Sequence, residues 1–200
     1  LPASVMYAAG LTKHVHHCTE RESTAMSTTT ANQQIGRRII VIGSSGCGKS
    51  TLGGAVAERL GIPFVELDAL HWDAGWTPAP DELFHQRIRD VIAEDAWVLA
   101  GNYTGKQQHV SWPRADTIIW LDLSLATALR RSWLRSWRRW RTQEELWNGN
   151  RERMREHLAL WDPDQSLLAY TARTHRRRRE QFEAAMRDPR WSHITFVRLR

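Results

Sequence analysis

The sequence predicts an α/β protein in which helices cover both faces of a parallel sheet. Three observations lead to this class. Short apolar runs alternate with segments of helical spacing, the runs are apolar nearly throughout as buried parallel strands are, and the first run leads through a glycine-rich turn into a helix. The 200 residues suffice for one such domain with a short appendage.

The predicted elements follow one another along the chain. The runs RIIVIG, PFVEL, AWVLAG, DTIIWLDL and HITFVRL are the expected strands, at 38–43, 63–67, 96–101, 116–123 and 193–199. The expected helices occupy 49–61, 80–94, 124–140 and 167–188. Gly61 followed by Pro63 is typical of a helix end, and Pro80-Asp81 is typical of a helix start. The segment 141–165 has no clean period.

The first 34 residues differ from the rest in composition. Their stretch ESTAMSTTTANQQ is small, polar and aperiodic, which is typical of disorder. We therefore expect a disordered tail over residues 1–34 and a single domain over residues 35–200.

The net charge of +6 is concentrated in the C-terminal part. Residues 126–200 hold 18 Lys and Arg against 9 Asp and Glu, whereas residues 1–125 hold 10 against 13. A basic region suggests an anionic partner, and both nucleotide phosphates and nucleic acid qualify. No apolar run reaches the ~20 residues that span a bilayer, so no membrane partner is expected. The two cysteines lie far apart and no export signal is visible, which favours a cytoplasmic location.

Residues 43–50, GSSGCGKS, match the phosphate-binding pattern G-x-x-x-x-G-K-[ST] between a strand and a helix. Glycines let successive backbone N–H groups point at a phosphate, and the start of the helix adds its positive end. We expect Lys49 to reach the β- and γ-phosphates of ATP, and the Ser50 hydroxyl to bind Mg²⁺. The complete ATP-binding set is Gly43, Ser44, Ser45, Gly46, Cys47, Gly48, Lys49, Ser50 and Thr51.

Three carboxylates at predicted strand ends are candidates for chemistry. Asp122 ends the run TIIWLD, a pattern that favours holding Mg²⁺ through water. Glu66 and Asp68 lie two residues apart, so on a strand both would point to the same face. Because the carboxyl ends of parallel strands meet at the ligand crevice, we expect Asp68 to accept the proton of an acceptor hydroxyl and Glu66 to help hold Mg²⁺. The alternative for Asp68 is a cap on the following turn.

Five segments in combination resemble the small P-loop proteins of the adenylate-kinase-like, DNA topology modulation (FlaR-like) family. They are GSSGCGKS, ELDALHW, GNY, RADTIIWLDL and ELWNGNRE. More distantly, Glu66-Leu67-Asp68 resembles the acidic pair of shikimate kinases, and Asp68-Ala-Leu-His71 resembles a segment of gluconate kinases. The resemblance covers roughly residues 37–200. It implies a three-layer P-loop NTPase fold with strand order 2-3-1-4-5 and a helical lid within about 131–165.

The resemblance also places an acceptor near the GNY segment. The residues expected around it are Asp68, His71, Trp72, Asn102 and Tyr103. One departure concerns Ala100, which stands just before GNY where the family often has an acidic residue. Any acid–base role at that position is absent, so more weight falls on Asp68.

The segment RRSWLRSWRRWR at 130–141 has two interpretations. Interleaved basic and aromatic residues are typical of a single-strand nucleic-acid binder, but also of an amphipathic helix. On a helical wheel one stripe holds Ala126, Leu129, Trp133, Trp137 and Trp140, which predicts that the tryptophans pack against the sheet or a neighbouring helix. Arg131, Arg135 and Arg138 lie opposite, and the first two are expected to neutralise the transferring phosphoryl group.

We therefore expect a kinase that uses ATP and Mg²⁺ to phosphorylate a hydroxyl group of a small molecule. One alternative is an ATP-binding regulator that contacts DNA through the basic C-terminal part. Another is a nucleoside monophosphate kinase, but only Arg87 and Arg89 lie between residues 68 and 100 to hold an acceptor phosphate.

Overall fold

The computed structural model describes residues 36–103, 105–151 and 166–200, which belong to one compact unit, Ile35–Arg200. The tail predicted at 1–34 lies outside the described residues, and so does part of the predicted lid, at 152–165. Among the described residues, no helix combines the length and the apolar character that crossing a membrane requires.

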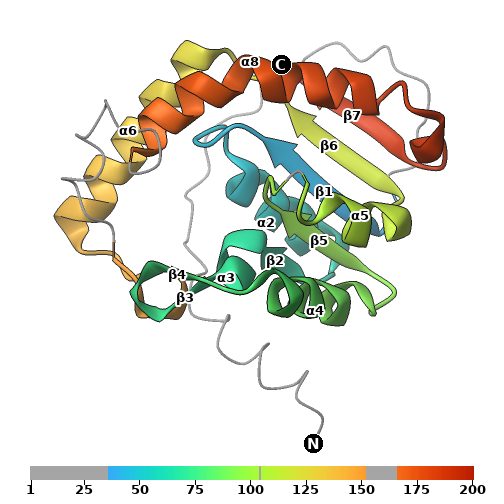
Figure 1. Ribbon diagram of the computed structural model, residues 1–200, viewed down its shortest axis with the longest axis horizontal. Helices are drawn as coiled ribbons and strands as arrows, with labels where there is room; N and C mark the ends of the chain where they lie inside the picture. Colours follow the sequence, from blue (N-terminus) through green and yellow to red (C-terminus); the bar gives the residue numbers. More distant parts are fainter. Residues whose placement is uncertain (1–35, 104, 152–165) are drawn as a thin grey trace, which may run out of the picture. The chain divides into compact units, whose positions relative to one another are not determined.

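Five parallel strands form the central sheet, in the order β2–β5–β1–β6–β7 (Figure 1). Their bounds are β1 (Arg38–Gly43), β2 (Phe64–Glu66), β5 (Trp97–Ala100), β6 (Thr117–Leu121) and β7 (Thr195–Leu199). Counted within this sheet alone, the order is 2-3-1-4-5, as predicted. The labels differ because a short antiparallel pair, β3 (Trp72–Asp73) and β4 (Thr77–Pro78), interrupts the count and was not predicted.

Four long helices occupy the predicted segments to within three residues at each end. They are α2 (Lys49–Leu60), α4 (Asp81–Ile92), α6 (Leu125–Thr142) and α8 (Leu167–Ala185). Shorter helical segments are α3 (Leu67–His71), α5 (Gln108–Ser111) and the 3₁₀ turns η1 (Ala74–Trp76), η2 (Trp112–Arg114), η3 (Trp147–Gly149) and η4 (Pro189–Trp191). These short segments were missed because they cover too few residues to show a helical period.

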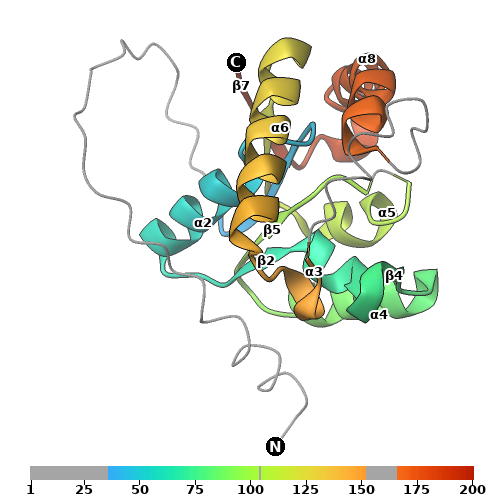
Figure 2. The same cartoon turned by 90° about the vertical axis from the view of Figure 1, so that its left-hand side faces the viewer.

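The sheet has an apolar core on each face. Alternate residues of β1 feed the two sides, with Ile40 and Ile42 in one cluster and Ile39 and Val41 in the other. The first cluster includes residues of α4 and α8, and the second includes Ala57 of α2. Figure 2 shows α2 and α4 on opposite sides of the sheet. Burial on both faces explains why β1 is apolar throughout.

Helix α6 presents small residues, not tryptophans, to the rest of the protein. Ala128 and Ser132 are fully buried, whereas Trp137 and Trp140 are 44% and 40% exposed. The predicted packing was therefore wrong for Trp137 and Trp140, whereas Trp133 is half-buried. A Cβ atom on Gly46 would lie 2.5 Å from the Ala128 carbonyl oxygen and 2.7 Å from the Ser132 nitrogen, so the main chain of the phosphate loop lies directly against this face. Only small side chains leave room for that approach.

Candidate active site

The phosphate loop, residues 43–50, has the backbone shape that anion binding requires. Gly46 and Gly48 adopt left-handed conformations, with φ of 75° and 95°, which glycine reaches without steric cost. Gly48 is also the N-cap of α2, and it supplies no side-chain hydrogen bond to the first turn. The amides at the start of α2 are therefore oriented toward a ligand, at the positive end of the helix.

Lys49 folds back over this loop. Its Nζ donates hydrogen bonds to the carbonyl oxygens of Gly43 and Ser44, at 3.1 and 3.0 Å. The ammonium group thus lies at the entrance of the turn that was predicted to receive phosphate. Ser50, the predicted Mg²⁺ ligand, is exposed at the start of the helix.

One arginine of α6 reaches the loop. Arg135 Nη2 donates to Ser45 Oγ at 3.3 Å, which joins the predicted lid helix to the phosphate site. Arg131, the other predicted arginine, is exposed on the same helix. Arg138 is also exposed and forms an ion pair of 3.6 Å with Glu144. Among the three arginines predicted on one side of this helix, Arg135 is shown in contact with the phosphate loop.

The predicted strand geometry of Glu66 and Asp68 was wrong. The strand ends at Glu66, and α3 begins at Leu67, which places Asp68 in the first turn of a helix. The helix forms because it buries Leu67 and Leu70 on one side. Asp68 does not serve as a cap either, since Glu66 is the N-cap and no side-chain cap bond is formed.

Asp68 instead contacts the GNY segment. The Tyr103 hydroxyl donates to Asp68 Oδ1 at 2.6 Å. The two segments lie close because Gly101 has no side chain: a Cβ atom there would lie 2.6 Å from Leu67 Cβ. Burial, followed by the negative charge of Asp68, raises the pKa of Tyr103 well above its usual value. Tyr103 therefore remains protonated and remains a hydrogen-bond donor to the carboxylate.

His71 and Trp72 complete this cluster. The His71 ring lies 4.6 Å from the Tyr103 ring and 4.8 Å from the Trp72 ring, centroid to centroid. Burial, with a smaller contribution from the charge of Lys106, lowers the pKa of His71 below 6.5. The structure thus brings four of the predicted acceptor residues together. Asn102, the fifth, stands between Gly101 and Tyr103 in the same segment, and its contact with an acceptor stays a prediction.

The segment after α6 supplies residues that sequence reasoning did not assign. We call residues 147–151 the clasp loop. Trp147 Nε1 donates to Glu66 Oε2 at 2.7 Å, so the strand-end carboxylate that was expected to bind Mg²⁺ holds an indole. Asn148 Nδ2 donates to the Trp72 carbonyl at 2.5 Å. Asn150 Oδ1 accepts from the Trp76 amide at 2.8 Å. The clasp loop therefore joins the end of α6 to the acceptor segment.

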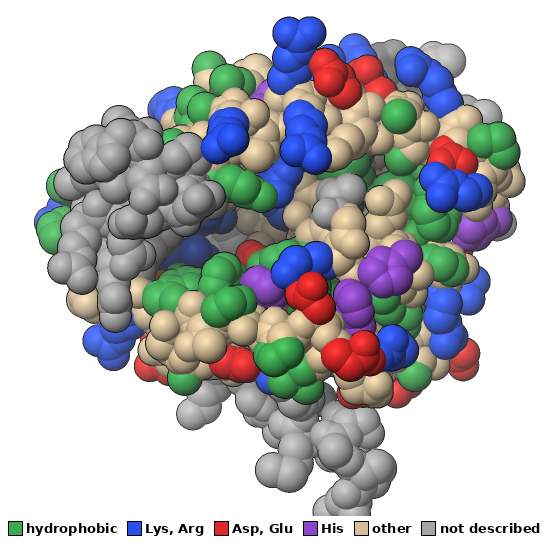
Figure 3. All heavy atoms as spheres, in the orientation of Figure 1, with side chains coloured by type: hydrophobic (Ala, Val, Ile, Leu, Met, Phe, Trp, Pro, Cys, Tyr) green, Lys and Arg blue, Asp and Glu red, His purple; other side chains and the backbone are tan. Residues whose placement is uncertain are grey.

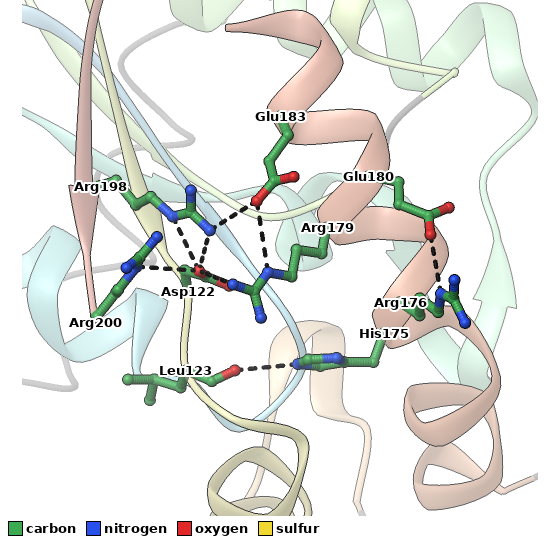
Figure 4. A network of polar contacts seen from close by, with 9 residues as sticks. All are labelled: Asp122, Leu123, His175, Arg176, Arg179, Glu180, Glu183, Arg198 and Arg200. Carbon is green, nitrogen blue, oxygen red and sulfur yellow. Dashed lines mark hydrogen bonds and ion pairs between the residues drawn. The ribbon is translucent and has the colours of Figure 1, made fainter.

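Asp122 lies in a network of arginines at the carboxyl ends of β6 and β7 (Figure 4). Its side chain is 3% exposed and accepts from Arg198 Nε at 2.9 Å and Nη2 at 2.5 Å. Arg179 and Arg200 lie 3.4 and 3.7 Å from the same oxygen. Glu183 of α8 accepts from Arg198 at 2.9 Å. The Asp122 carboxylate is engaged by guanidinium groups, which would have to move before it could bind a metal ion.

One face of the molecule is hollowed. Figure 3 shows the hollow in the orientation of Figure 1, with basic side chains visible inside it and hydrophobic side chains along its lower rim. The register of the sheet places the phosphate loop and the α3 segment at the same end of the sheet. Glu66 pairs with Ala100, and Ala100 pairs with Val41, so Glu66 and Val41 lie at the same level of the sheet. Asp68 comes two residues after Glu66, and Gly43 comes two residues after Val41.

The parallel sheet and the phosphate loop define a protein with the P-loop nucleotide-binding fold. Residues 45–185 match the model of the shikimate kinase family, and the chain belongs to that family. The shikimate kinase of Symbiobacterium thermophilum is 34% identical over 108 residues, which are 47% of this chain and 62% of that protein. The shikimate kinase of Thermobifida fusca is 30% identical over 105 residues, 46% and 61% of the respective chains. The match thus spans less than two thirds of either relative.

Solved structures include similar chains at low sequence identity. A gluconokinase from Sinorhizobium meliloti is 21% identical, with a TM-score of 0.47, and the match covers 84% of this chain and 83% of that one. The finer resemblance to DNA topology modulation proteins stays a prediction, and the family match gives no support to a DNA-contacting regulator.

Proposed function

We propose that this protein is an ATP-dependent kinase that transfers the γ-phosphate to a hydroxyl group of a small molecule. Membership of the shikimate kinase family supports this function. The observation that carries it is the position of the Asp68 carboxylate. Tyr103 donates a hydrogen bond of 2.6 Å to this carboxylate, and the sheet register places Asp68 at the same end of the sheet as the phosphate loop. The phosphate loop and the proton-accepting carboxylate then lie at the same end of the sheet.

The loop residues fit a nucleoside triphosphate. In the proposal, the amides of the phosphate loop and of the first turn of α2 bind the phosphates, and Lys49 leaves its own carbonyl partners to contact the β- and γ-phosphates. Mg²⁺ would be held by the Ser50 hydroxyl and would neutralise charge on the phosphates. Glu66 contributes to this site only after Trp147 has released it. The widely separated cysteines fit a cytoplasmic setting.

The chemical step is assigned to residues of three elements. Asp68 of α3 accepts the proton of the acceptor hydroxyl, while Tyr103 fixes the orientation of the carboxylate. Arg135 of α6 stabilises negative charge on the transferring group, and Arg131 is the second arginine of this proposal. Enclosure by the clasp loop keeps water from competing with the acceptor.

The test compares Asp68→Asn with the wild type. A panel of hydroxyl compounds is screened for ATP-dependent phosphorylation, and ATP binding is measured by calorimetry. The variant is expected to bind ATP normally and to lose phosphoryl transfer, with Lys49→Ala as the blank that loses both. Transfer by Asp68→Asn at near the wild-type rate would show that the base assignment is wrong.

A further inference from the structure

The acceptor end of the site is rich in indole surface. Trp72, Trp76 and Trp147, which we call the indole wall, form a chain of edge-to-face contacts with centroid distances of 5.7 and 6.4 Å. Trp147 also donates to Glu66, so the indole wall extends to the end of β2. Indoles offer large, rigid apolar faces with a polar edge, and such faces suit flat ligands that carry hydroxyl groups.

The charges at this end are carboxylates. Glu66 and Asp68 both accept hydrogen bonds from neutral donors, the Trp147 indole and the Tyr103 hydroxyl. Each of these bonds orients its carboxylate without neutralising it. A ligand that approaches therefore meets negative charge and hydrogen-bond acceptors, which attract hydroxyl donors and repel an anion.

Two cations near this end of the site, Arg87 and Lys106, are already paired. Arg87 Nη1 donates to the Leu70 carbonyl at 2.8 Å, and its Nη2 donates to Asp73 at 2.9 Å. Lys106 pairs with Asp81 at 2.7 Å. An acid or a phosphate ester needs an arginine or lysine for its charge. Here these side chains balance carboxylates of the protein itself.

Arg139 lies with its guanidinium group against the indole wall, and this group is engaged as well. Its guanidinium lies over the Trp147 ring at 5.9 Å and forms an ion pair of 3.7 Å with Glu144. Its side chain is 16% exposed, so it serves as packing for the clasp loop. Its charge is shared between an aromatic face and a carboxylate.

We propose that the acceptor is an uncharged polyhydroxy compound with a flat apolar face, the chemistry shared by sugars and nucleosides, and not a hydroxy acid or a monophosphate. This rests on the proposed kinase function. The acceptor O–H bond breaks and its proton passes to Asp68, while the oxygen bonds to the γ-phosphorus. The bond from that phosphorus to the bridging oxygen breaks, and ADP leaves with both electrons.

The experiment presents the full chain with two panels. One contains neutral sugars, cyclitols and nucleosides, and the other contains shikimate, gluconate and nucleoside monophosphates. Turnover is measured with Mg²⁺ and ATP, and binding is measured separately by calorimetry with Mg²⁺ and ADP. The expected result is that a neutral compound exceeds every anionic one by about 100-fold or more in kcat/KM. Comparison of the sugars with the nucleosides in the neutral panel identifies which of these two classes the acceptor belongs to.

A paired variant tests the indole wall. Trp72→Leu is expected to raise the KM for the neutral acceptor about tenfold, the effect of losing one aromatic contact, with the KM for ATP unchanged. Trp137→Leu, on the exposed face of α6, is the matched control and changes neither. Thermal unfolding of both variants shows whether they are folded.

The outcomes separate this inference from the proposed function. Preference for an anionic compound, or an unchanged acceptor KM in folded Trp72→Leu, overturns the acceptor class and leaves the kinase function standing. If ATP binds but nothing is phosphorylated, the proposed function fails. The calorimetric panel then still decides the acceptor class: binding of a neutral compound supports it, and binding of an anionic compound, or of neither, overturns it.

Discussion

The Tyr103 hydroxyl donates to Asp68 Oδ1 at 2.6 Å and so joins the segment after β5 to the first turn of α3. The two residues lie 35 positions apart in the sequence, and neither is in a strand. A buried neutral phenol is an orienting partner for a carboxylate because it fixes one oxygen without adding positive charge. The catalytic assignment of Asp68 depends on this contact.

The raised pKa of Tyr103 predicts a specific dependence of stability on pH. Above pH 10, the usual pKa of tyrosine, the unfolded chain loses the phenolic proton while the folded chain keeps it. Stability is therefore present below pH 10 and is lost as the pH rises beyond it. In urea titrations, the wild type should lose about 1 kcal/mol more unfolding free energy than Tyr103→Phe between pH 10 and pH 11. Equal slopes would contradict the buried, protonated phenol.

Trp147 connects the clasp loop to Glu66, and its indole N–H is the group to remove. Trp147→Phe keeps the ring but loses the 2.7 Å hydrogen bond to the carboxylate. A hydrogen bond to a charged group contributes about 1.5–3 kcal/mol, so closure over the acceptor should weaken by roughly tenfold or more. We expect slower transfer and faster ATP hydrolysis without acceptor, measured by ADP release. Trp140→Phe on α6 is the control, and an unchanged ratio of hydrolysis to transfer would contradict the role of the clasp loop.

Arg135 is predicted to act in the transition state and not in the binding of ATP. Its contact with Ser45 places a guanidinium at the phosphate loop. Arg135→Ala should lower kcat by about 10³, the lower end of the effects of such arginines, with ATP affinity changed only a few-fold. Rapid-quench kinetics and calorimetry separate the two quantities. The exposed Arg141 provides the control, and loss of ATP affinity in place of kcat would refute the assignment.

Asp122 is predicted to stabilise the fold without serving as a metal ligand. Its carboxylate is 3% exposed and lies within 3.7 Å of three arginines. Asp122→Asn leaves Arg198 without its closest partner, and because that arginine is only partly buried we expect a loss of about 2–3 kcal/mol in unfolding free energy. The Mg²⁺ concentration that gives half-maximal activity should stay the same. A shift of this concentration with no loss of stability would restore the metal role.

Local patterns were sufficient for the phosphate loop and the central strand. The phosphate-binding pattern is recognised within eight consecutive residues. Strand β1 is apolar throughout because both faces of the sheet are covered. The place of Asp68 was not predictable in the same way. Strand β2 has three residues, and a pattern of that length does not distinguish a longer strand from a strand followed by a helical turn.

Contacts between distant segments decided the other differences. The wheel for α6 separates arginines from tryptophans, but it cannot show that the main chain at Gly46 needs small residues opposite it. Asp122 and Arg198 are 76 residues apart, and Trp76 and Asn150 are 74 apart. No local period indicates such pairs, because their partners come together only in the folded chain.

The most direct test of the account is calorimetric titration of the protein with Mg²⁺ and ATP, alongside Lys49→Ala. The account predicts one saturable site in the wild type and loss of most of that affinity in the variant, with both proteins equally folded. A wild type that takes up no nucleotide, or a variant that binds as tightly, would contradict the phosphate site from which the kinase function follows.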